Sequence, residues 1–155
     1  MARIEITNLQ DYVKVERKLI TQIMLKALKK EGRTTKSLSV VLTDNQHLRD
    51  LTDRYMGHPS DTDVISFPLD QPGWPCDGGV NGEIIASAER AAKVAKLRGS
   101  SAKAELLLYL VHGLLHLVGY DDNTKAEAER MHETEEKLLE QFGFENIYCA
   151  RGEVQ

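Results

Sequence analysis

The chain has few of the residues that mark specialised protein classes. Its 155 residues include one tryptophan, four prolines and two cysteines, Cys76 and Cys149. Two cysteines this far apart in sequence form neither a cysteine-rich zinc module nor the disulfide framework of a small secreted domain. No segment approaches the ~18 consecutive apolar residues of a membrane span. We therefore expect a reduced, cytoplasmic protein that does not enter a membrane.

The charge of the chain is nearly balanced, with 20 basic and 24 acidic residues and a net charge of -4. Such a chain does not attract nucleic acid as a whole, so RNA binding would depend on a local basic patch. Two groups of basic residues are candidates, although each group alone is more typical of a solvated helix face. They are Lys26, Lys29, Lys30, Arg33 and Lys36, and Lys93, Lys96, Arg98 and Lys103.

The pattern of apolar residues predicts strands early in the chain and helices late. Strands are expected at 3–7, 37–43, 63–69 and 82–86. Helices are expected at 11–30, 43–55, 87–98, 102–118 and 124–142. This order indicates an α+β or mixed α/β layout with one small sheet packed by helices. Residues 71–80 are predicted to form a surface loop that contains Trp74, and the tail at 143–155 is expected to be less ordered.

Two histidines on the most apolar predicted helix carry the strongest chemical signal. His112 and His116 are four residues apart, which places their Cβ atoms ~5–6 Å apart on one face of a helix. Two such imidazoles can bind one metal ion, which offsets the cost of burying them side by side. Gly119 can end the helix in the left-handed conformation, so that Asp121 or Asp122 folds back as a third ligand. Three protein ligands and an open position are typical of catalytic zinc sites.

The alternative to a metal site is a pair of core histidines, each of which donates to a backbone carbonyl. A peptidase is disfavoured because Gly113 stands where helical zinc proteases carry their glutamate base. Glu83, Glu105 or a loop residue remain candidates for a general base.

Three motifs occur in the order and spacing of a known family. The segment from His112 to Asp121, His-Gly-Leu-Leu-His-Leu-Val-Gly-Tyr-Asp, is followed by Met131 and acidic residues. It resembles the motif of the YbeY family of endoribonucleases and rRNA maturation factors. Residues 62–67 and 82–87 resemble two strands of that family, Thr-Asp-Val-Leu-Ser-Phe and Gly-Asp-Ile-x-Ile-Ser. The resemblance implies a single α+β domain over 1–155, in which about five helices pack a small mixed four-stranded sheet. It places a metal site on a central helix and the following turn.

The resemblance also implies an activity. The protein would be a cytoplasmic, zinc-dependent, single-strand-specific endoribonuclease in rRNA maturation and ribosome quality control. Its partners would be ribosomal RNA and the small ribosomal subunit or ribosomal proteins. One zinc ion per chain would be held by His112, His116 and Asp122, where the family has a third histidine in place of Asp122. Two histidines and a carboxylate also admit iron or manganese. His132 ranks below Asp122 as a third ligand, and an aspartate at 122 is also typical of a turn.

A second departure lies before Thr62. The family usually has an arginine after the aromatic residue that ends the short helix, and here Met56 follows Tyr55. Loss of a guanidinium removes a phosphate clamp and a stabiliser of developing charge. Arg54 and His58 are the candidate catalytic residues that would replace it, with His58 as a phosphate ligand or a general acid or base. The competing hypothesis is a non-catalytic, zinc-containing assembly factor that binds the ribosome or rRNA.

Overall fold

A computed structural model describes residues 3–69, 79–145 and 147. Within these ranges it has a four-stranded sheet and five helices, which confirms the predicted α+β class. The strands are β1 (Ile4–Asn8), β2 (Thr34–Thr43), β3 (Val64–Pro68) and β4 (Gly79–Ser87). The helices are α1 (Arg17–Lys30), α2 (Asn45–Met56), α3 (Ala88–Arg98), α4 (Ala102–Leu117) and α5 (Lys125–Glu140).

The sheet is mixed, with the strand order β1-β2-β4-β3. Strand β2 pairs in parallel with β1 and β4, whereas the edge strand β3 pairs antiparallel to β4. The central register sets Ile6 beside Val40, Val40 beside Ile84 and Ile84 beside Ser66. Because side chains alternate along each strand, this register sorts the apolar residues onto two faces.

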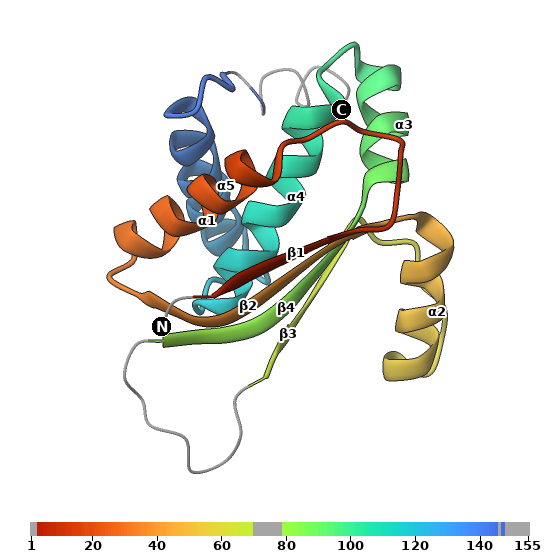
Figure 1. Ribbon diagram of the computed structural model, residues 1–155, viewed down its shortest axis with the longest axis horizontal. Helices are drawn as coiled ribbons and strands as arrows, with labels where there is room; N and C mark the ends of the chain where they lie inside the picture. Colours follow the sequence, from red (N-terminus) through yellow and green to blue (C-terminus); the bar gives the residue numbers. More distant parts are fainter. Residues whose placement is uncertain (1–2, 70–78, 146, 148–155) are drawn as a thin grey trace.

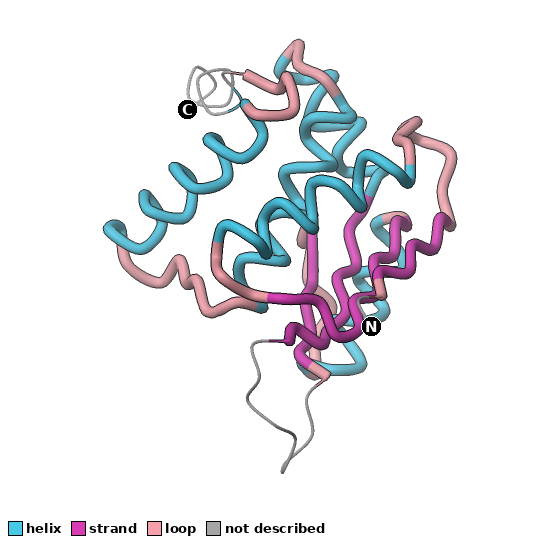
Figure 2. Tube along the Cα trace, turned by 60° about the vertical axis from the view of Figure 1, so that its left-hand side comes forward, coloured by secondary structure: helices cyan, strands magenta, loops and turns pink. Residues whose placement is uncertain are grey.

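The two faces of the sheet are covered unequally (Figure 1). Val40 and Ile84 belong to the main core with α1, α4 and α5. Their neighbours Val41 and Ile85 turn to the other face, where they pack with Leu48 of α2 in a smaller cluster. Figure 2 shows the same division from another side, with most of the helical chain lying over one face of the strands. The protein therefore has a thick layer on one side of the sheet and a single helix on the other.

Helix α4 is the central element of the thick layer, and a glycine lets it lie close to the sheet. A Cβ at Gly113 would lie 2.9 Å from Cγ2 of Ile84 and 3.2 Å from Cγ2 of Val64. The first distance is shorter than real Cβ contacts, so a larger residue would require Ile84 or the helix to shift. His112 directly precedes this contact point, and His116 follows one turn later. Both histidines are therefore held at a fixed height above β3 and β4.

Some boundaries differ from the sequence prediction. The helix predicted over 11–30 begins at Arg17, because the side chain of Gln10 bonds both the backbone N–H and the carbonyl of Val13 and closes a turn there. Strand β4 begins at Gly79, earlier than predicted, because Gly79 pairs with Thr34 at the start of β2. Trp74, both cysteines and most of the predicted tail lie outside the described residues. Among the helices that are described, none is both long and apolar enough to cross a bilayer.

Candidate metal centre

The turn after α4 brings the third candidate ligand back toward the two histidines. Gly119 has a φ of 107°, which favours glycine, and the backbone N–H of Tyr120 donates to the carbonyl of Leu115 at 2.9 Å. This bond closes the helix end, so the chain reverses and presents Asp122 to the face that carries His112 and His116.

Three ligand atoms converge at this point. Nε2 of His112 lies 3.1 Å from Nε2 of His116. Oδ2 of Asp122 lies 3.5 Å from the first nitrogen and 3.8 Å from the second. The side chains of His112, His116 and Asp122 are 24%, 29% and 42% exposed, so the group is accessible from solvent. In the described part of the chain, this is the group of histidine and acidic side chains with the geometry to hold a metal ion.

The hydrogen bonds of the two rings decide which nitrogen faces the centre. Nδ1 of His112 lies 2.6 Å from a carboxylate oxygen of Glu135, and Nδ1 of His116 lies 3.0 Å from the carbonyl of Tyr120. Both partners are acceptors, so each Nδ1 carries the proton that it donates. Both Nε2 lone pairs then point at one another and at the Asp122 carboxylate. Such an arrangement of neutral rings is repulsive unless a positive charge lies between them. A proton on one Nε2 meets that requirement in the metal-free protein, and a divalent metal ion meets it by binding all three atoms.

Glu135 contacts the candidate centre, and the sequence did not single it out. It lies on α5, and its side chain is 0% exposed. Burial by itself lowers the pKa of His112. However, the hydrogen bond and charge of Glu135, with the charges of Asp63 and Asp122, outweigh burial and raise this pKa above its ordinary value of 6.5. Glu135 thus orients the ring and increases its basicity, as carboxylates behind metal-bound histidines do.

The two predicted catalytic residues are not part of this group. Arg54 lies on α2, which covers the opposite face of the sheet from α4. Arg54 and His58 are exposed. Neither side chain forms a hydrogen bond or an ion pair in the ranges that the structure describes. Their catalytic role stays a prediction, and any approach to the triad would have to pass around the β3 edge.

The alternative ligand and the candidate bases are also separate from the triad. His132 is exposed on α5 and does not belong to the metal-binding group. Glu83 alternates with Ile84, so it shares the α2 face with Ile85 and accepts a bond from the Ser39 hydroxyl at 3.3 Å. Glu105 is buried at the other end of α4, in its first turn. The three residues that the sequence proposed as metal ligands therefore lie together, whereas none of the proposed bases lies beside them.

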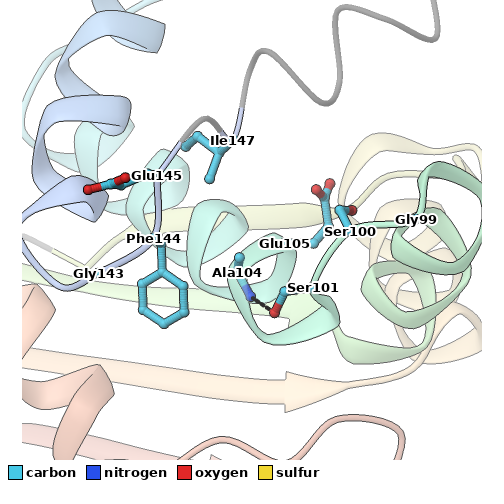
Figure 3. A pocket seen from close by; sticks show the side chains of 9 residues that line it. All are labelled: Gly99, Ser100, Ser101, Ala104, Glu105, Gly143, Phe144, Glu145 and Ile147. Atoms are coloured by element: carbon cyan, nitrogen blue, oxygen red, sulfur yellow. Dashed lines mark hydrogen bonds between the residues drawn. The ribbon is translucent and has the colours of Figure 1, made fainter.

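The N-terminal end of α4 borders a cavity of about 340 Å³ (Figure 3). Ser101 caps the helix there by accepting a bond from the backbone N–H of Ala104 at 3.1 Å. Phe144 and Glu105 line the same space. The cavity contains no histidine or cysteine ligand, and three helical turns separate its Ser101 rim from His112. It is therefore distinct from the metal centre.

Comparison with known proteins identifies the family. A family model described as endoribonuclease YbeY matches residues 5–143. The chain belongs to the YbeY endoribonuclease family. The three motifs in the sequence indicated the same family, and the match spans both the metal-binding group and Glu135.

Individual relatives cover most of the chain. The endoribonuclease YbeY of Carboxydothermus hydrogenoformans is 41% identical over 144 residues, which are 91% of this chain and 98% of the relative. The Mycobacterium leprae endoribonuclease YbeY is 33% identical over 151 residues, with coverage of 93% and 85%. The solution structure of TM1509 from Thermotoga maritima matches with a TM-score of 0.60 over 90% of this chain and 91% of that chain. At 23% identity, this last likeness supports the fold alone.

Proposed function

We propose that the protein is a zinc-dependent, single-strand-specific endoribonuclease that acts in rRNA maturation and ribosome quality control. The observation that carries the metal dependence is the convergence of two imidazole Nε2 atoms and one carboxylate oxygen, 3.1 to 3.8 Å apart. Membership of a ribonuclease family supports an RNA substrate. The ribosomal context, including the small subunit or its proteins as partners and action in the cytoplasm, follows from the family resemblance.

The residues of the centre have separable roles in this proposal. A divalent ion, when bound, supplies a Lewis acid that polarises a phosphodiester and acidifies water. His112 and His116 would bind it through Nε2, and Asp122 through Oδ2. Glu135 keeps the His112 ring oriented, because it accepts a hydrogen bond from Nδ1 and so leaves Nε2 as the nitrogen that faces the ion. The negative charge of Asp122 weakens the Lewis acidity compared with a third neutral imidazole, and it makes iron or manganese acceptable alternatives to zinc.

The basic residues near the end of α1 are the better of the two candidate RNA surfaces. Lys93 pairs with Glu89 at 3.3 Å and Lys103 with Glu16 at 3.7 Å, so the second group is partly neutralised. Lys26, Lys29 and Lys30 are exposed. These three form no ion pair among the residues that the structure describes. Free ammonium groups on one helix suit a phosphate backbone.

The second candidate function is a non-catalytic, zinc-containing factor that binds the ribosome or rRNA. Met56, which is 57% exposed at the end of α2, favours it because no guanidinium stands there to clamp a phosphate. In that case the ion would be a structural clip with four ligands and no open position.

Chelation separates the two functions. Purified protein is stripped with a chelator, its metal content is measured, and it is assayed on single-stranded and double-stranded RNA before and after Zn²⁺ is restored. The endoribonuclease proposal expects cleavage of single strands that disappears with the ion and returns with it. Cleavage that survives complete removal of metal would reject this mechanism. An ion that raises the melting temperature without supporting cleavage would establish the assembly factor instead.

A further inference from the structure

Tyr120 is held at three points in the turn between α4 and Asp122. Its backbone N–H donates to the carbonyl of Leu115 at 2.9 Å, and its own carbonyl accepts from Nδ1 of His116 at 3.0 Å. Its hydroxyl donates to Oε2 of Glu31 at 3.0 Å, across 89 positions of sequence. One residue therefore joins the end of α4, a metal-binding histidine and the end of α1.

The hydrogen bond to Glu31 restrains the Tyr120 side chain. Cavities of about 220 Å³ and about 200 Å³ both border Tyr120 and Glu31. The ring is therefore not enclosed by packed side chains on all sides. The guanidinium of Arg130 lies 5.2 Å from the ring centroid and attracts the ring without fixing its direction. One side of the ring packs against the main core, and the hydrogen bond to the Glu31 carboxylate fixes the position of its hydroxyl end.

We infer that Tyr120 is a positioning residue for the metal centre, and that its bond to Glu31 holds the turn in the geometry that binds the ion. The inference rests on the metal-binding part of the proposed function. The position of the Tyr120 carbonyl sets the rotation of the His116 ring and the tautomer that exposes its Nε2. Asp122 follows two residues later, so movement of the turn displaces the third ligand as well. Glu31 is the C-cap residue of α1 and directly follows Lys29 and Lys30. The candidate RNA surface is therefore connected to the metal centre through the Glu31–Tyr120 hydrogen bond.

Metal affinity is the readout that tests this role. The Zn²⁺ dissociation constant is measured by competition with a chromogenic chelator for wild type, Tyr120→Phe, Glu31→Ala and Glu31→Gln. Tyr120→Phe and Glu31→Ala are expected to bind Zn²⁺ about tenfold more weakly, because removing a group that positions a metal ligand typically lowers metal affinity by at least that factor. Glu31→Gln keeps an acceptor oxygen for the hydroxyl, so it is expected to restore affinity close to that of wild type. Bound Co²⁺ should show shifted visible absorption bands in the two weakened variants only.

A matched control and the melting temperature separate positioning from simple stabilisation. Tyr12→Phe removes a hydroxyl from a half-exposed tyrosine outside the centre and is expected to change nothing. A merely structural role would lower the melting temperature of the metal-free protein and leave Zn²⁺ affinity and the Co²⁺ spectrum at wild-type values. That result for Tyr120→Phe overturns the inference. If Tyr120→Phe does not fold, equal Zn²⁺ affinity in Glu31→Ala and Glu31→Gln overturns it. Wild-type protein that binds no ion would instead reject the metal centre itself.

Discussion

The two faces of the sheet differ in how firmly they hold their candidate functional residues. On the α4 face, each histidine of the candidate centre has a second hydrogen bond behind it, to Glu135 or to the Tyr120 carbonyl. On the α2 face, the fully buried cluster is small, and Tyr55 and Met56 at the helix end are 62% and 57% exposed. The thick layer can preorganise ligands, because packed neighbours and hydrogen bonds restrict their rotamers. Polar residues along α2 are also hydrogen-bonded, such as Ser60 to Thr52, but the side chains of Arg54 and His58 have no hydrogen bond or ion pair among the described residues.

This difference predicts abrupt losses from changes on the α4 face and graded effects from changes on the α2 face. The largest expected effect is that of His112→Ala, which removes one of two imidazole ligands and the hydrogen bond between that ring and the buried Glu135 carboxylate. We expect no stoichiometric metal by elemental analysis and no metal-dependent RNA cleavage. His132→Ala is the matched control, because this histidine is exposed and outside the group. One equivalent of metal in purified His112→Ala would contradict the assignment.

Glu135→Gln tests the support behind the ring. The amide removes the charge that favours a basic, correctly oriented imidazole, so Zn²⁺ should bind roughly 10-fold to 100-fold more weakly. Competition titration measures the constant. Glu129→Gln, an exposed position on the same helix, should leave it unchanged. An unchanged Zn²⁺ dissociation constant in Glu135→Gln would mean that the Glu135 carboxylate does not strengthen metal binding.

Met56→Arg tests the α2 face directly. A guanidinium at this exposed position would restore the family's arginine, and one added charged hydrogen bond to a phosphate should raise kcat about tenfold. Single-turnover cleavage of a short single-stranded RNA measures the gain, and Met56→Gln controls for side-chain length. If Met56→Arg cleaves no faster than wild type, another residue already supplies the clamp, for which Arg54 and His58 are the candidates.

The smallest predicted effect is the pH dependence of the metal-free protein. Because the pKa of His112 is raised by Glu135, Asp63 and Asp122, its protonation stabilises the fold. This stabilisation is complete below the ordinary pKa of 6.5 and is lost as pH rises through the raised value. The melting temperature of chelated wild type should therefore fall by a few degrees relative to His112→Asn across this range. If the difference in melting temperature between wild type and His112→Asn does not vary with pH, protonation of His112 does not contribute to stability.

The sequence predicted the α4 face better than the α2 face for a physical reason. The spacing of His112 and His116 and the left-handed glycine after them are local features that a helix converts directly into geometry. The choice between Asp121 and Asp122 needed the course of the turn. Glu135 was hidden because α5 carries several glutamates, and only packing against α4 decides which of them meets His112. Strand alternation likewise does not reveal on which side of the sheet α2, with Arg54, will lie.

Gly113 restricts the chemistry that this centre can acquire. Glutamate at this position would supply the general base of a zinc peptidase, but its Cβ would overlap Cγ2 of Ile84 at 2.9 Å. Ile84 or the helix would have to shift, and a shift of the helix would move both imidazoles. The close packing of α4 on β4 thus opposes the gain of a glutamate base at this position.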